Sequence, residues 1–103
     1  MQTQKAMNKN KLFVLIDNTL EPVYGCVQGG HAVAQWLLEK GVGWNNEYLI
    51  YLSADVYKWK QKLSFMGIDF VEFKEPDLGN KTTSLAVLGH DNLFKKLKLI
   101  SAK

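Results

Sequence analysis

The fold is decided by residues 27–39, which read VQGGHAVAQWLLE. Alanine, leucine, glutamine and glutamate dominate this stretch and no proline interrupts it, so it predicts an α-helix. Its polar side chains Gln28, His31 and Gln35 recur at i, i+3 and i+7, which places them on one narrow stripe of an otherwise apolar helix. The stripe fits two interpretations, a set that faces a ligand or polar residues satisfied near a helix start.

Two adjacent glycines, Gly29 and Gly30, lie inside this predicted helix. Each weakens a helix by about 1 kcal/mol relative to alanine. We therefore expect a close approach at this point, either of the helix to a sheet or of a ligand to the first turn of the helix.

The rest of the chain alternates between strand-like and helical segments. The expected elements, in chain order, are a buried strand at 11–18, a loop at 19–24, the helix at 27–39, a turn at 40–46, a strand at 47–52, a helix at 54–66, a strand at 69–74, a polar turn at 75–81, a strand at 82–88 and a short last helix that Asp91 caps. The order β-α-β-α-β-β-α is typical of an α/β domain with helices on both faces of its sheet. We therefore predict a three-layer α/β/α fold with a mixed four-stranded sheet, formed by residues 11–103 behind a flexible tail at 1–10.

Length and composition fit one globular domain. The chain has 103 residues, of which 47% are hydrophobic, enough for a core without disulfides. No apolar run approaches the roughly 20 residues that a membrane span needs, and residues 1–10 hold no signal-peptide core. We expect a soluble, cytoplasmic protein that makes no membrane contact. Cys26 is the only cysteine, and with just His31 and His90 beside it a structural zinc site is a poor fit.

The basic residues restrict the kind of nucleic-acid contact that is expected. All 13 are lysines, and the net charge is +3. Lysine binds phosphate as a point charge and lacks the fork that reads guanine edges, so the composition favours backbone attraction over sequence-specific duplex recognition. The lysines gather at residues 58–62 and 95–98. We expect these two groups to lie on different sides of the sheet, so that they cannot all serve one binding face.

A second polar cluster surrounds the predicted turn at 75–81. Its members are Glu75, Asp77, Thr82, Thr83 and Ser84. Ligand sites in parallel-type sheets gather at the carboxyl ends of strands, so this turn and the polar stripe of the first helix are expected to meet at one sheet edge. A carboxylate, hydroxyls and an imidazole brought together could orient a water, accept its proton and hydrogen-bond a carbonyl oxygen.

Several motifs occur in a characteristic order along the chain. A strand ends in Asp17, a loop follows, and residues 28–32 read Gln-x-x-His-Ala; further on come Gly-Ile-Asp at 67–69, the acidic turn Glu-Pro-Asp at 75–77 and the strand TSLAVLG at 83–89. In these features, over nearly everything after Lys11, the sequence resembles the type 2 peptidyl-tRNA hydrolases and their shorter relatives.

The resemblance implies a hydrolase of translation that cleaves the ester between a peptide and the 3′ end of tRNA by activated-water attack. It implies no metal and no organic cofactor, and a tRNA partner that is bound through lysines. The oligomeric state stays open between a monomer and a homodimer.

The resemblance also assigns roles to residues of this chain. The acidic residue beyond the third strand maps onto Asp77, with Glu75 as a close competitor, and the hydroxyl at the start of the fourth strand maps onto Thr83 or Ser84. These groups would position a water and stabilise the developing oxyanion. The full expected set is His31, Gln28, Glu75, Asp77, Thr83 and Ser84 for catalysis, and Tyr24, Asp17 and Lys81 for substrate binding.

Three positions depart from the family. Tyr24 stands where the family has a lysine, Leu15 replaces an arginine-like residue, and the turn after Asp77 is shorter. Divergent relatives also lack that lysine, and this chain is closer to them. The alternatives are therefore a non-catalytic relative that binds tRNA or a protein, and a hydrolase of some other ester or amide. Tyr24 is the feature that separates an active enzyme from a binding protein.

Overall fold

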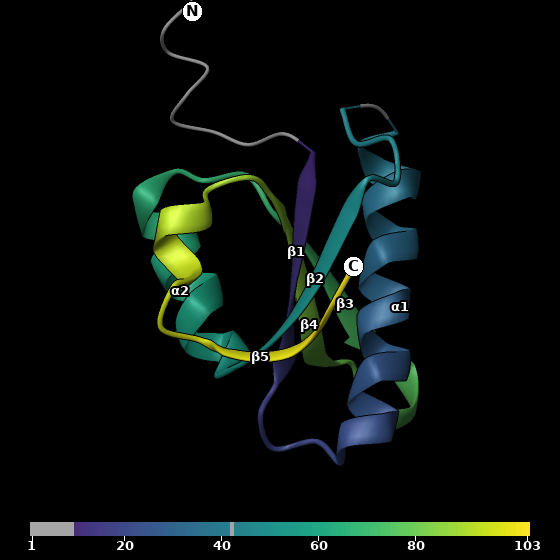
Figure 1. The fold of residues 1–103 in the computed structure, drawn as a ribbon. Helices are drawn as coiled ribbons and strands as arrows, with labels where there is room; N and C mark the ends of the chain where they lie inside the picture. Colours follow the sequence, from purple (N-terminus) through teal and green to yellow (C-terminus); the bar gives the residue numbers. More distant parts are fainter. Residues whose placement is uncertain (1–9, 42) are drawn as a thin grey trace, which may run out of the picture.

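A mixed five-stranded sheet forms the centre of the described part of the chain, residues 10–41 and 43–103 of a computed structural model (Figure 1). In chain order the elements are β1 (Lys11–Asp17), α1 (Pro22–Glu39), β2 (Tyr48–Ala54), α2 (Val56–Met66), β3 (Val71–Glu75), the 3-10 helix η2 (Pro76–Leu78), β4 (Lys81–Leu88), the 3-10 helix η3 (Asp91–Phe94) and β5 (Lys98–Ala102). The strands lie in the order β3-β4-β1-β2-β5, where β1 and β2 are parallel and the other neighbours are antiparallel.

The sheet separates two hydrophobic layers. Leu12, Val14 and Ile16 of β1 face α1, whereas Phe13 and Leu15 face α2. The two helices cover opposite faces of the sheet (Figure 1), which gives the α/β arrangement that the sequence predicted. Because both faces are covered, β1 is apolar over five successive residues instead of alternating.

The C-terminal segment differs from the prediction of four strands and a last α-helix. After His90, whose φ of 65° is left-handed, the chain makes only the short helix η3. Phe94 then enters the core, with its ring centroid 4.9 Å from that of Phe13 and 5.3 Å from that of Trp59. The chain next extends as β5 along the free edge of β2. Pairing with an exposed strand edge outweighs local helix preference here, because that edge would otherwise leave its backbone groups without ladder bonds.

The first helix begins earlier than expected. Residues 22–24, predicted as loop, form its first turn. Glu21 caps this turn by accepting a hydrogen bond from the backbone nitrogen of Tyr24 at 2.9 Å, and Pro22 occupies the first helical position, where its missing N–H costs nothing.

The N-terminal end of the domain is anchored through Asn10. Its backbone carbonyl accepts hydrogen bonds from the backbone nitrogen of Tyr48 at 3.0 Å and from Nε1 of Trp44 at 3.2 Å. The rest of the expected tail, residues 1–9, lies outside the described residues. Among the described residues, no helix is both long and apolar enough to cross a membrane.

Glycines seat α1 directly on the sheet. A Cβ added to Gly25 or to Gly29 would lie 2.9 Å from the side chain of Ile16, and at Gly29 it would also lie 3.1 Å from the ring of Tyr51. The predicted close approach of the helix to the sheet is therefore confirmed for Gly29. It does not hold for Gly30, where an added Cβ would meet nothing within 4 Å.

The two adjacent glycines make a matched test of this contact. We expect Gly29→Ala to lower the free energy of unfolding by about 1 kcal/mol, because overpacking outweighs the gain in helix propensity. Gly30→Ala should instead raise it by about 0.5 to 1 kcal/mol. Urea unfolding of both variants checks this, and an equal gain in both would contradict the close seating of α1.

Candidate functional site

The side chain of Gln28 is the centre of a buried polar network between α1 and the sheet. Its Oε1 accepts a hydrogen bond from Oγ1 of Thr83 at 2.6 Å, and its Nε2 donates to Oε1 of Glu75 at 2.8 Å. Its backbone carbonyl accepts from the hydroxyl of Ser84 at 2.8 Å. Gln28 is 1% exposed, and both hydroxyl residues are fully buried. The network therefore fixes the amide in one orientation and ties α1 to the ends of β3 and β4.

A β-bulge explains how two successive hydroxyls reach the same glutamine. Phe73 of β3 pairs with Ser84, whereas its neighbour Lys74 pairs with Thr82, so Thr83 is an extra residue in β4. In a regular strand, adjacent side chains point to opposite faces. A bulge breaks this alternation and re-aims a side chain, and here both hydroxyls meet Gln28 on the α1 face.

Glu75 links the network to the turn that carries Asp77. Its Oε2 accepts a hydrogen bond from the backbone nitrogen of Asp77 at 3.1 Å, which caps η2. The hydrogen bond from Gln28, the bond from the Asp77 N–H and the charge of His31 together lower the pKa of Glu75, against the effect of burial. Glu75 is therefore a fixed carboxylate at neutral pH, and the side chain of Asp77 next to it is exposed.

Tyr24 and His31 flank the buried network on the exposed side of α1. The His31 ring stacks on Phe73, with centroids 4.6 Å apart and planes at 11°. Tyr24 is 36% exposed. Desolvation and the charges of Glu75 and Asp77 raise the pKa of Tyr24, which keeps its phenol protonated and able to donate a hydrogen bond.

The structure thus brings together seven of the residues predicted from the sequence. These are Tyr24, Gln28, His31, Glu75, Asp77, Thr83 and Ser84. Lys81 lies at the same strand end, as the register partner of Glu75.

Two residues expected near these groups lie elsewhere. The hydroxyl of Thr82 donates to Oε2 of Glu72 at 2.6 Å, on the α2 face of the sheet. Asp17 is 5% exposed, and its carboxylate accepts from the hydroxyl of Thr19 and, at 3.4 Å, from the backbone nitrogen of Val56. Its bonds thus fasten the loop after β1 to the start of α2.

Sequence reasoning missed the contribution of Phe73 and the bulge at Thr83. The available signal for the bulge was the run of three hydroxyl residues at 82–84, since strict alternation cannot bring two adjacent ones, Thr83 and Ser84, to one face. No comparable signal pointed to Phe73, because a stacking partner for His31 depends on where α1 lies over β3.

The expectation that the two lysine groups lie on different sides of the sheet is wrong for Lys95 and Lys96, whereas Lys98 lies on the α1 face, opposite to Lys62. Because η3 packs beside α2, Lys62, Lys95 and Lys96 line one hollow of about 300 Å³. The ammonium of Lys62 lies 4.5 Å from the centroid of the Trp59 ring. Lys60 pairs with Glu72 at 2.8 Å. These lysines face away from the Gln28 network, across the sheet.

Within residues 10–41 and 43–103, no group of three or more histidine, cysteine, aspartate or glutamate side chains is placed to hold a metal ion. No family model matches the chain, and no curated protein matches it.

The hydroxyl of Thr83 is expected to stabilise the fold. Thr83→Val removes the donor to Gln28 and leaves a buried amide oxygen unsatisfied, which should lower the free energy of unfolding by about 1 to 3 kcal/mol. Thr83→Ser keeps the hydroxyl and should retain most of the stability. Urea denaturation of the two variants tests this, and an unchanged stability of Thr83→Val would contradict the role of the hydrogen bond.

Glu75 is expected to make the free energy of unfolding depend on pH in the acidic range. A carboxyl whose pKa is lower in the folded state stabilises the protein above its unfolded pKa, and this stabilisation is lost as the pH falls through the folded pKa. For Glu75 the loss begins below its ordinary value of 4.5. Wild-type protein should therefore lose more unfolding free energy between neutral pH and pH 3 than Glu75→Gln does. Parallel pH profiles for the two proteins would contradict the role of Glu75 in the network.

Proposed function

We propose that this protein is an ester hydrolase that acts on peptidyl-tRNA by activated-water attack. One observation carries the proposal: exposed Asp77, Tyr24 and His31 lie around a buried polar network, and a hydrogen bond from the Asp77 backbone nitrogen to Glu75 fixes the Asp77 turn to that network. The sequence resemblance supplies the substrate class, and the geometry supports the type of chemistry.

Asp77 is the proton acceptor in this proposal. Its carboxylate is exposed, while its backbone nitrogen is held by Glu75. An anchored carboxylate can orient a water molecule and take its proton during attack on the ester carbonyl. Glu75 itself cannot take this role as readily, because its two oxygens already accept bonds from Gln28 and Asp77 and it is only 8% exposed.

Tyr24 is the hydrogen-bond donor to the developing oxyanion. Its phenol stays protonated because desolvation and the nearby Glu75 and Asp77 carboxylates raise its pKa. A neutral donor stabilises an oxyanion less than the lysine that stands here in the family, so we expect slow turnover. The phenol ring also offers a surface on which the terminal adenine can stack.

Gln28, Thr83 and Ser84 are positioning residues in this mechanism. Their polar atoms are buried and bonded to one another, so they act through the placement of Tyr24 and of the Asp77 turn. His31 is exposed and held flat on Phe73, where its ring nitrogens can bind the substrate ribose or carbonyl. Lys81, at the same strand end, is the lysine placed to meet the phosphates near the tRNA terminus.

A second candidate function is a non-catalytic protein that binds tRNA. The presence of Tyr24 in place of the family's lysine favours this function, because a site without that cation stabilises an oxyanion less well. Both functions predict tRNA binding, so the hydrolysis assay separates them.

Release of N-acetylated amino acid from labelled tRNA is the decisive measurement. Asp77→Asn should lower the rate about 100-fold or more, and Tyr24→Phe about 100-fold, because each removes a group used in the transition state. Tyr24→Lys should raise the rate. Asp69→Asn removes an exposed carboxylate that pairs with Lys40 and serves as the matched control.

Two results would overturn the catalytic proposal. If wild-type protein binds the aminoacylated tRNA but does not hydrolyse its ester faster than the ester hydrolyses without protein, the non-catalytic function is supported. If hydrolysis is fast and unaffected by Asp77→Asn, the reaction takes place elsewhere on the protein.

A further inference from the structure

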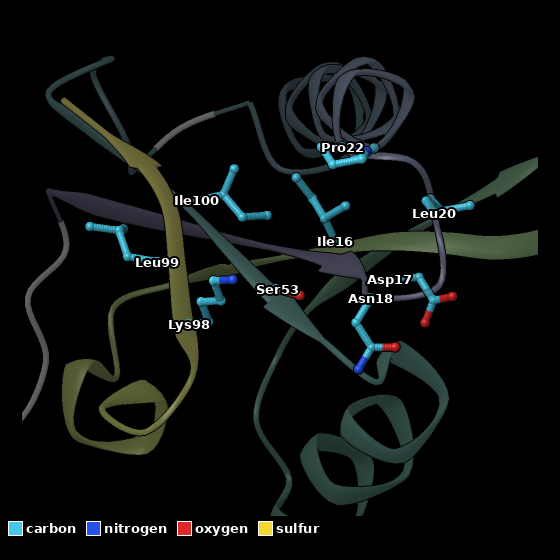
Figure 2. Close-up of a pocket in the computed structure, with 10 residues that line it drawn as sticks. Ile16, Asp17, Asn18, Leu20, Pro22, Ser53, Lys98, Leu99 and Ile100 are labelled. Atoms are coloured by element: carbon cyan, nitrogen blue, oxygen red, sulfur yellow. The ribbon is translucent and has the colours of Figure 1, made fainter.

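A pocket of about 400 Å³ lies between α1 and the edge strand β5 (Figure 2). Gln28 bonds to β3 and β4 on the other flank of α1. The pocket exists because α1 packs mainly over β1, β3 and β4 and reaches less far over the β2–β5 side of the same sheet face. Its volume falls within the roughly 300 to 1,000 Å³ of pockets that hold small molecules.

The pocket lies at the point in the sheet where ligand sites are expected. It opens beside the carboxyl ends of β1 and β2, which are parallel neighbours. The chain leaves β1 for α1 on one face and leaves β2 for α2 on the opposite face (Figure 1). In open α/β sheets, ligands bind in the crevice that forms where successive connections diverge in this way.

The walls of the pocket are mainly apolar. Ile16 and Leu20 line it from β1 and the following loop, and Leu99 and Ile100 line it from the edge strand β5. Ile100 is 39% exposed, so part of the β5 side is open to solvent. The apolar part of a small ligand would therefore displace water from this wall.

The polar groups of the pocket suit an anion. Lys98 and Ser53 line it together with Asn18, and among the described residues no ion pair involves Lys98. Asp17 also lines it, but its carboxylate already bonds to Thr19 and Val56 and points away from Lys98 (Figure 2). The pocket thus holds one ammonium, that of Lys98, and one carboxylate, that of Asp17, and the two groups lie at different ends of the site (Figure 2).

We propose that this pocket binds a small amphipathic anion, with an apolar chain against Ile16, Leu20 and Ile100 and an acidic head group at Lys98 and Ser53. The site is separate from the proposed hydrolase site, because the close contact of Gly25 and Gly29 with Ile16 lies between the two sites. It does not depend on the proposed function.

Octanoate is the probe for this site, in a titration followed by the backbone amide signals of the isotope-labelled full chain. Saturable shifts are expected at Ile16, Ser53 and Ile100. Affinity should rise about three- to fourfold for each methylene from pentanoate to octanoate, as apolar burial requires. Lys98→Gln should weaken octanoate binding about three- to tenfold, whereas Lys98→Arg should retain it.

Two controls keep the result specific. Lys103→Gln makes the same charge change outside this pocket and should leave affinity unchanged. Octan-1-ol should bind to wild-type protein more weakly than octanoate does. Its affinity should be the same for wild-type protein and for Lys98→Gln, because the alcohol carries no charge. Because Lys98 is exposed, we expect Lys98→Gln and Lys98→Arg to fold as the wild-type protein does.

Three outcomes would overturn the inference. One is the absence of saturable shifts at the pocket amides. Another is unchanged octanoate affinity in Lys98→Gln. The third is a set of shifts centred on the exposed Val23 and Leu38 of α1, which would show adsorption to an apolar surface instead of binding in the pocket.

Discussion

The buried amide of Gln28 is the interaction on which the rest of the candidate site depends. From α1, its side chain bonds to both β3 and β4, through Glu75 and Thr83. A buried amide is costly unless its donor and acceptor are both satisfied, so the network holds these three elements in one register. Because Glu75 also caps η2, the same constraint extends to the turn that presents Asp77.

The position of α1 follows from a second constraint, which is steric. Gly25 and Gly29 let the helix backbone rest on Ile16, and this close seating brings Gln28 within reach of the strands. The helix packs mainly over β1, β3 and β4, so much of β2 and β5 lies beyond it on that face. The two flanks of one helix therefore differ in chemistry, with a hydrogen-bonded network on one flank and an apolar pocket with a single cation on the other.

The charge on the surface is arranged differently from what the linear order of lysines suggests. The packing of Phe94 against Trp59 brings η3 beside α2, and three lysines then share one hollow across the sheet from the Gln28 network. In the proposed hydrolase, Lys81 lies at the same strand end as Glu75, and the far group adds only long-range attraction to a polyanion. Such attraction is screened beyond about 10 Å at ordinary salt concentrations.

The sequence by itself determined the α/β class, the buried strand β1 and the presence of α1 and α2, because hydrophobic periodicity and glycine punctuation are local signals. It also pointed to Gln28, Glu75, Asp77 and Thr83 as one polar group. Only the tertiary structure decided the bulge that turns Thr83 toward Gln28, the separation of Asp17, and the addition of β5. These features depend on which backbone edges and side chains meet across the sheet, since a segment such as β5, exposed along its whole length, has no hydrophobic pattern of its own.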